Sequence, residues 1–157
     1  MNLAERIDIM VKLGKYLIAD SPQLKSIKQK AYEKNKWFTQ QFADLALKNI
    51  SEQFLDRAKL EKWIKIYHLD DNISPKKIGI VMAGNIPLVG FHDFLSVFIS
   101  GHKQKIKLSE KDDILFPYTS HQAHSNLQGI RRRIEAPHEN PGTQYICLGL
   151  YNKYPLR

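Results

Sequence analysis

The first seventy residues place apolar side chains at steps of three and four, which is the spacing of amphipathic α-helices. Ser21 and Thr39 suit N-cap positions because a hydroxyl oxygen can accept from a free backbone N–H, and Pro22 suits the first helical turn. The apolar stripes are narrow, so these helices need a partner surface to cover them. The predicted helices span residues 3–17, residues 23–34, a segment after Thr39, and residues 56–67.

A different pattern begins after residues 72–75. A short β-branched apolar run is typical of a buried parallel strand, and a nearly continuous apolar stretch is typical of a helix packed on a sheet. Strand, loop, helix, glycine turn and strand together make one right-handed crossover unit. The predicted elements are a strand over 77–82, a loop from Ala83 to Pro87, a helix over 88–100, a turn at Gly101, and a strand over 103–108.

The chain is therefore expected to be an α/β protein, with a helical leader over 1–70 and a partial crossover unit over 71–118. Its 157 residues, 43% of them apolar, are enough for one modest domain. Neither helical nor strand periodicity is sustained over 119–157, so we expect a poorly ordered tail or one read out of frame. If the reading frame of the gene is shifted by one base after Tyr118, permitted codons can encode an amphipathic helix. Stop codons directly after the shift in the coding DNA would exclude the out-of-frame hypothesis.

The formal net charge of +8 indicates anionic partners, such as nucleic acid, acidic lipid or a phosphate-rich cofactor, or simply a basic surface. One alternative function is a small basic nucleic-acid-binding module that uses residues 23–36 and Arg131–Arg133. No stacking aromatic residues interleave with these arginines, so no specific nucleic-acid partner is expected. The chain start does not resemble a signal peptide, and no apolar run approaches the roughly 20 residues of a membrane span. We expect a cytoplasmic protein.

The single cysteine, Cys147, excludes an internal disulfide and a cysteine-based zinc cluster. Its neighbours do not supply the electropositive surroundings that activate a thiol, so we interpret it as inert. His121 and His124 have the spacing to share a metal on one helix, but no third ligand stands in a matching position. No metal site is predicted.

The loop after the first predicted strand is the place where doubly wound folds bind ligands. Gly84 lets the backbone approach a ligand closely, and the free N–H groups of the following helix favour an anion. The glycine-rich dinucleotide fingerprint GxGxxG is absent. By residue type alone, Asn85 is a turn residue and Lys107 a strand-end contact with solvent.

The order of motifs changes this interpretation. A strand followed by Ala-Gly-Asn-Ile-Pro-Leu, a long apolar helix, Ser-Gly-His and Ile-Lys-Leu-Ser-Glu resembles the aldehyde dehydrogenase superfamily. In that superfamily the loop usually reads Pro-Trp-Asn-Phe-Pro, and the second strand ends Leu-Lys-Pro-Ser-Glu. Residues 82–113 look closer to the LuxC-like fatty-acyl-CoA reductases, and the likeness covers about the first 118 residues. Gly84 and Leu108 depart from the superfamily pattern in ways that fit this branch.

The resemblance implies an NADPH-dependent reduction of fatty acyl-CoA to the aldehyde through a cysteine thioester. It implies that Asn85 helps hold the oxyanion of the intermediate, a role worth about 2.7–4 kcal/mol of barrier. Lys107 and Ser109 would hold the adenosine ribose and its 2′-phosphate, which favours NADPH, whereas Glu110 leaves NADH open. The positions implied to bind cofactor are Ala83, Gly84, Lys107, Ser109 and Glu110.

In this family the catalytic cysteine lies in a separate, downstream domain. The chain is therefore expected to be an N-terminal fragment that keeps the oxyanion asparagine and part of the cofactor site but lacks the nucleophile. Homo-oligomers are implied only for the full-length family. A helical interaction protein, with residues 1–70 as its working part, would leave the motifs of 78–109 unexplained.

Overall fold

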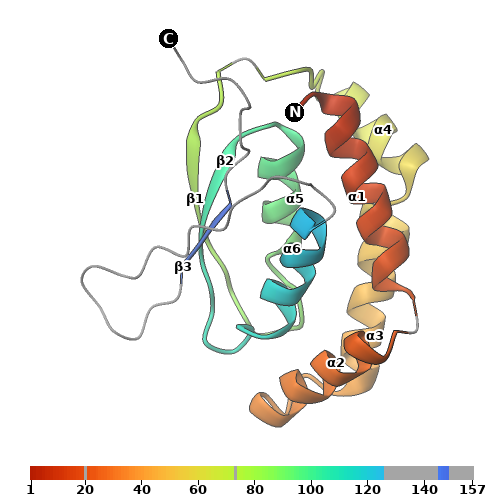
Figure 1. The fold of residues 1–157 in the computed structure, drawn as a ribbon, viewed down its shortest axis with the longest axis vertical. Coiled ribbons are helices and arrows are strands. Elements are labelled where there is room, and N and C mark those ends of the chain that lie inside the picture. Colours follow the sequence, from red (N-terminus) through yellow and green to blue (C-terminus); the bar gives the residue numbers. More distant parts are fainter. Residues whose placement is uncertain (20, 73, 126–144, 149–157) are drawn as a thin grey trace.

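The computed structural model describes residues 1–19, 21–72, 74–125 and 145–148. Three layers follow one another: the sheet, then α5 against one face of it with α6 beside α5, then α1, α3 and α4 on the far side of those two helices (Figure 1). The elements are α1 (Leu3–Leu17), α2 (Pro22–Lys34), α3 (Gln40–Asn49), the π-helix η1 (Ile50–Phe54), α4 (Arg57–Ile66), β1 (Lys77–Val81), α5 (Phe91–Ile99), β2 (Lys103–Lys107), α6 (Leu115–Ser125) and β3 (Tyr145–Leu148).

The four predicted helices of the leader are confirmed. Ser21 and Thr39 are N-caps, and their hydroxyls accept from the backbone N–H groups of Leu24 at 3.1 Å and Phe42 at 3.3 Å. The π-helix η1 is a feature that the pattern did not predict. It follows α3 directly, and the N–H of Leu55 donates to the carbonyl of Ile50 at 3.1 Å, one residue further along than an α-helical bond.

The crossover pattern is confirmed as mixed α/β structure. Strands β1 and β2 pair in parallel, in a register that runs from Lys77 opposite Lys103 to Val81 opposite Lys107. Alternate strand residues point to opposite faces, and Ile106 on the inner face is fully buried against α5. Strand β3 adds antiparallel to the other edge of β2, so the strand order is β1-β2-β3.

Both strands end one residue earlier than predicted, strand β3 lies within the tail expected to be poorly ordered, and two boundaries differ by three residues or more. The helix expected over 88–100 begins only at Phe91, because Leu88 has a left-handed backbone conformation with φ of 58° and cannot continue a helix. Helix α6 crosses the boundary expected at Tyr118 and runs to Ser125. Thr119 is polar but fully buried in this helix, and its hydroxyl donates to the carbonyl of Leu115 at 2.9 Å, which makes its burial tolerable. Arg131–Arg133 and the rest of 126–144 lie outside the described residues.

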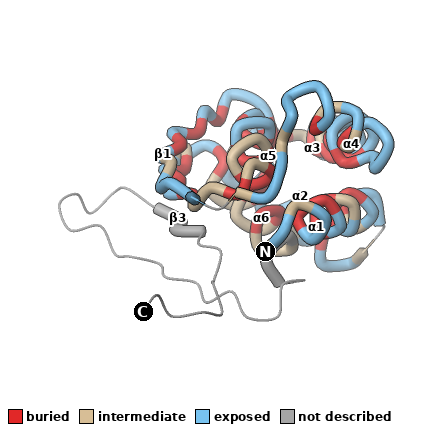
Figure 2. The backbone as a smooth tube through the Cα atoms, turned by 90° about the horizontal axis from the view of Figure 1, so that it is seen from above, coloured by how far each residue is buried: buried red, intermediate tan, exposed pale blue. Residues whose placement is uncertain are grey.

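The core lies where α5 is enclosed between the sheet and the leader, and the inward sides of the leader helices share it (Figure 2). Aromatic rings fill its centre. Phe94 meets Phe116 of α6 edge to face, with ring centroids 5.7 Å apart. None of the helices in the described ranges is both long and apolar enough to cross a membrane.

A buried arginine holds the leader to the crossover unit. Arg6 of α1 is 1% exposed, and burial lowers its pKa against the opposing effect of Asp71 and Asp70. Its Nε donates to the carbonyl of Ile99 at the end of α5 at 2.8 Å. Its two Nη atoms donate to the carbonyls of Met1 at 3.1 Å and Asp70 at 2.9 Å. One side chain thus joins α1, the C-terminus of α5, and the segment that leads into β1.

Replacing this arginine should destabilise the whole fold. Arg6→Met keeps a long side chain but leaves buried carbonyls without donors, so we expect the free energy of unfolding to fall by about 3 kcal/mol. Lys12→Met, at an exposed position of the same helix, is the control and should change it by less than about 0.5 kcal/mol. Equal urea midpoints for the two variants would show that Arg6 does not join these segments.

Candidate functional site

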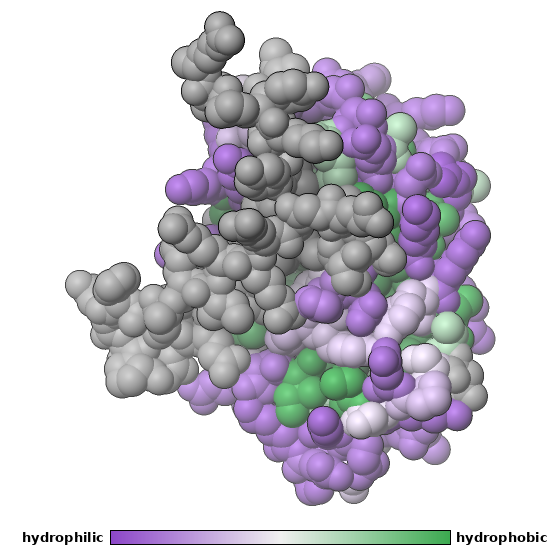
Figure 3. All heavy atoms as spheres, in the orientation of Figure 1, coloured by the Kyte–Doolittle hydropathy of each residue, from purple (hydrophilic) through white to green (hydrophobic). Residues whose placement is uncertain are grey.

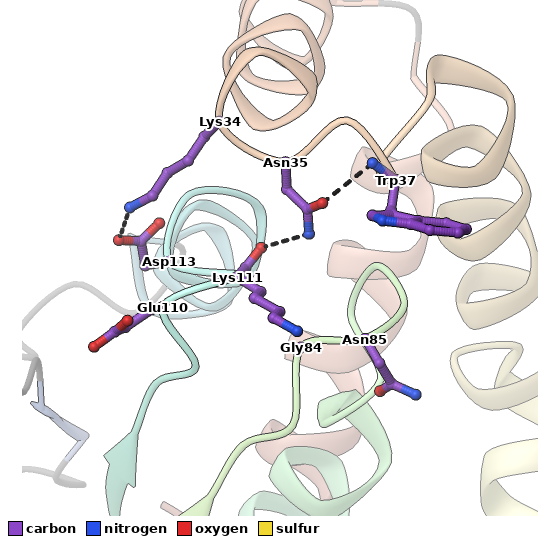
Figure 4. Close-up of a pocket in the computed structure, with 8 residues that line it drawn as sticks. All are labelled: Lys34, Asn35, Trp37, Gly84, Asn85, Glu110, Lys111 and Asp113. Carbon is purple, nitrogen blue, oxygen red and sulfur yellow. Dashed lines mark hydrogen bonds and ion pairs between the residues drawn. The ribbon is translucent and has the colours of Figure 1, made fainter.

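An open pocket of about 880 Å³ lies between the loops that follow β1 and β2 and the turn between α2 and α3 (Figure 4). The two loops leave the carboxyl ends of paired parallel strands, so they emerge at the same edge of the sheet. The lining residues are Lys34, Asn35, Trp37, Gly84, Asn85, Glu110, Lys111 and Asp113.

The two loops touch at Gly84. A Cβ atom built on Gly84 would lie 2.3 Å from the Oγ and 2.7 Å from the Cβ of Ser109, distances that no side chain can occupy. The backbone of the first loop therefore lies directly on Ser109 because residue 84 has no side chain. The hydroxyl of Ser109 also accepts from the N–H of Lys111 at 3.3 Å, which shapes the second loop.

The structure brings together only part of the set predicted from the sequence. Gly84, Asn85 and Glu110 line the pocket, and Ser109 forms the wall behind Gly84. Ala83 and Lys107 are not among the lining residues. Lys107 ends β2 on the sheet face away from α5, since its strand neighbour Ile106 points inward.

The helical leader supplies a wall that the sequence did not predict. The side-chain amide of Asn35 donates to the carbonyl of Lys111 at 3.2 Å, and its oxygen accepts from the N–H of Trp37 at 3.1 Å. Lys34 forms an ion pair with Asp113. Trp37 is 77% exposed, and the Lys111 side chain runs toward the loop of Gly84 and Asn85 (Figure 4). The local sequence could not predict this side of the pocket, because it depends on a contact between Asn35 and Lys111, which are 76 residues apart.

Asp112 is a second residue that the sequence did not single out. Its carboxylate is 5% exposed and accepts from the N–H of Leu88 at 2.8 Å and the N–H of Phe116 at 3.2 Å. Burial raises its pKa to about 6, against the opposing effect of these backbone donors, and nearby Asp113 adds to the rise. The carboxylate holds the first loop in its left-handed turn at Leu88 and sets the start of α6.

The lining is chemically mixed. The ammonium groups of Lys34 and Lys111 attract phosphate, although Asp113 neutralises much of the first. The Glu110 carboxylate can accept from hydroxyl groups, the Asn85 amide can donate to an anion, and the exposed ring of Trp37 offers a stacking face. No cysteine lines the pocket, and no group of His, Cys, Asp or Glu in the described chain could hold a metal ion.

Comparison with known proteins gave no match to a family model, to a curated protein or to a solved structure.

Adding one methyl group to Gly84 should separate the two loops. In Gly84→Ala the new Cβ collides with Ser109, so we expect a loss of about 1–3 kcal/mol in the free energy of unfolding. Gly79→Ala is the control, because no atom lies within 4 Å of the Cβ it would add. Adding Ser109→Gly to Gly84→Ala should recover much of the loss. Equal stability of the two alanine variants would contradict this packing.

The buried carboxylate should leave a signature in the pH dependence of stability. Asp112 holds its proton up to pH about 6 when folded, but loses it near its ordinary pKa of 3.8 when unfolded. Between these values the unfolded chain binds fewer protons, so the free energy of unfolding falls as pH rises, and it levels off above about 6. Relative to Asp112→Asn, the unmodified protein should lose at most about 3 kcal/mol over this window. Urea titrations at several pH values that give a constant difference would exclude Asp112 as the cause.

Proposed function

We propose that this pocket is part of the cofactor and oxyanion site of an NADPH-dependent fatty-acyl-CoA reductase of the aldehyde dehydrogenase type. One observation carries the proposal: at the carboxyl ends of two paired parallel strands, Gly84 lies on Ser109, and Asn85 and Glu110 of the same two loops are among the residues that line an open pocket. These four residues are spread over two sequence motifs, and the resemblance assigns all of them to one site.

The residues present fit a nucleotide cofactor. A pocket of about 880 Å³ lies within the size range of small-molecule and cofactor sites. The missing side chain at Gly84 lets the backbone come close to a pyrophosphate, and the ammonium of Lys111 beside this loop would neutralise its charge. Glu110 would accept from ribose hydroxyls. Lys107 lies outside the pocket lining at the end of β2, and the resemblance alone assigns it to the 2′-phosphate, which distinguishes NADPH from NADH.

When bound, the nicotinamide would supply the hydride. The part that we assign to Asn85 is electrostatic: its exposed amide donates to the oxygen that becomes negative during acyl reduction. The thiol that accepts the acyl group has no counterpart in the pocket lining. Cys147 lies in β3, where its backbone pairs opposite Lys105 of β2. We therefore assign to the described residues cofactor binding and oxyanion stabilisation, in a cytoplasmic setting, and not the acyl-transfer step.

Cofactor titration by calorimetry tests the proposal. We expect weak binding of NADPH, with Lys107→Ala weakening it about tenfold while changing NADH binding little, because only NADPH carries the 2′-phosphate. Lys111→Ala should weaken both cofactors alike, since the pyrophosphate is common to them. Lys62→Ala, at an exposed position of α4, is the control.

The outcomes separate the residue assignments from the function. Equal NADPH affinity for the unmodified protein and Lys107→Ala would show that Lys107 does not contact the cofactor. It would not contradict cofactor binding in the pocket itself. Absence of binding of either cofactor to the unmodified protein would contradict the proposed function itself.

A further inference from the structure

The sheet face opposite α5 is dominated by lysine. In a parallel pair, residues in register point to the same side of the sheet, so the outward positions of β1 stand beside those of β2. The inward positions, Ile80, Gln104 and Ile106, are buried. The six outward positions of β1 and β2, which we call the lysine face, are Lys77, Gly79, Val81, Lys103, Lys105 and Lys107.

The charges of this face are accessible. Lys77, Lys105 and Lys107 are exposed and Lys103 is half-buried. Lys77, Lys103 and Lys107 have no carboxylate partner within ion-pair distance among the described residues. Over the rest of the described surface that Figure 3 shows, hydrophilic residues predominate beside one hydrophobic patch in the lower half of the view.

This arrangement opposes folding rather than favouring it. Lys77 lies directly opposite Lys103, and like charges in cross-strand pairs are destabilising. Parallel sheets usually have both faces covered by helices and are apolar on both, whereas this face holds four ammonium groups, one glycine and one valine. A surface that concentrates one sign of charge at the expense of stability is typical of a binding site for the opposite charge.

We propose that the lysine face binds the surface of an anionic phospholipid bilayer. Three of its lysines stand in a row along β2, with Cα atoms about 6.6 Å apart, and Lys77 of β1 stands beside Lys103, about 4.8 Å across the strands, so the four charges face one plane of mobile headgroups. Clusters that bind acidic lipid usually contain about four to eight basic residues, and this face holds the smallest such number. Val81, which is 76% exposed at the end of the face, adds an apolar contact for the interface.

The side chains of β1 and β2 on this face are poorly suited to nucleic acid. Single strands are held by aromatic rings on which bases stack, and none of the six positions is aromatic. Bidentate contacts to phosphate come from arginine, and none of the six is arginine. The proposal rests on the outer sheet face and not on the pocket, and it shares only Lys107 with the proposed cofactor site.

Vesicle co-sedimentation with the full chain tests it. The protein should bind phosphatidylcholine vesicles that contain phosphatidylglycerol, and not vesicles of phosphatidylcholine alone. The triple variant Lys77→Gln, Lys103→Gln, Lys105→Gln should bind more than about tenfold more weakly. Lys107 is left unchanged because it belongs to the proposed cofactor site. The matched control, Lys12→Gln, Lys62→Gln, Lys65→Gln, removes the same charge from exposed helix positions and should bind almost as the unmodified protein does.

Three results would overturn the proposal. The first is no binding of the unmodified protein to phosphatidylglycerol vesicles. The second is an equal loss in the two triple variants, which would mean that binding follows net charge and not this face. The third is a lysine-face variant that loses duplex DNA binding while it keeps vesicle binding, which would assign the face to nucleic acid. Thermal unfolding followed by circular dichroism, with a midpoint for the lysine-face variant no lower than that of the control variant, ensures that the comparison is between folded proteins.

Discussion

The geometry of the fold depends on one buried cation, Arg6, whose guanidinium serves three backbone carbonyls from separate parts of the chain. A guanidinium can do this because its donors point in fixed, diverging directions in one plane. The close fit extends to Gly101, where φ is +76° and an added Cβ would lie 2.8 Å from an Arg6 Nη atom. These contacts fix the relative positions of α1, the end of α5 and the segment that leads into β1, and they involve no residue of the pocket.

Two sets of contacts connect the surroundings of Arg6 to the pocket. Helix α5 fixes β2 through the side chain of Gln104, which donates to the carbonyl of Phe94 at 3.1 Å. The loops beyond the strands are then held by Asp112, which binds the backbone of Leu88, and by the leader, whose Asn35 binds the backbone of Lys111. The pocket is thus built mainly from side chains that bind backbone, and Asn85 and Glu110 stay exposed at its lining.

Local patterns predicted the elements well because their causes are local. The caps at Ser21 and Thr39 and the apolar steps of α1 act within one or two turns. The left-handed turn at Leu88 depends on a carboxylate 24 residues away, and the wall at Asn35 depends on a contact across 76 residues, so neither could be read from neighbours. The position of Lys107 was easier to predict from the sequence. With Ile106 pointing inward, strand alternation alone places Lys107 on the opposite face.

The ammonium groups facing outward from β1 and β2 also bear on how the fold responds to its medium. The Cα atoms that carry them are about 4.8 Å apart between Lys77 and Lys103 and about 6.6 Å apart along β2, both shorter than the Debye length of about 8 Å at physiological ionic strength. Dissolved monovalent salt therefore relieves their repulsion only in part. A multivalent anion held against them would relieve more of it, and because such an anion binds only the folded strands, its occupancy and the unfolding temperature would rise together.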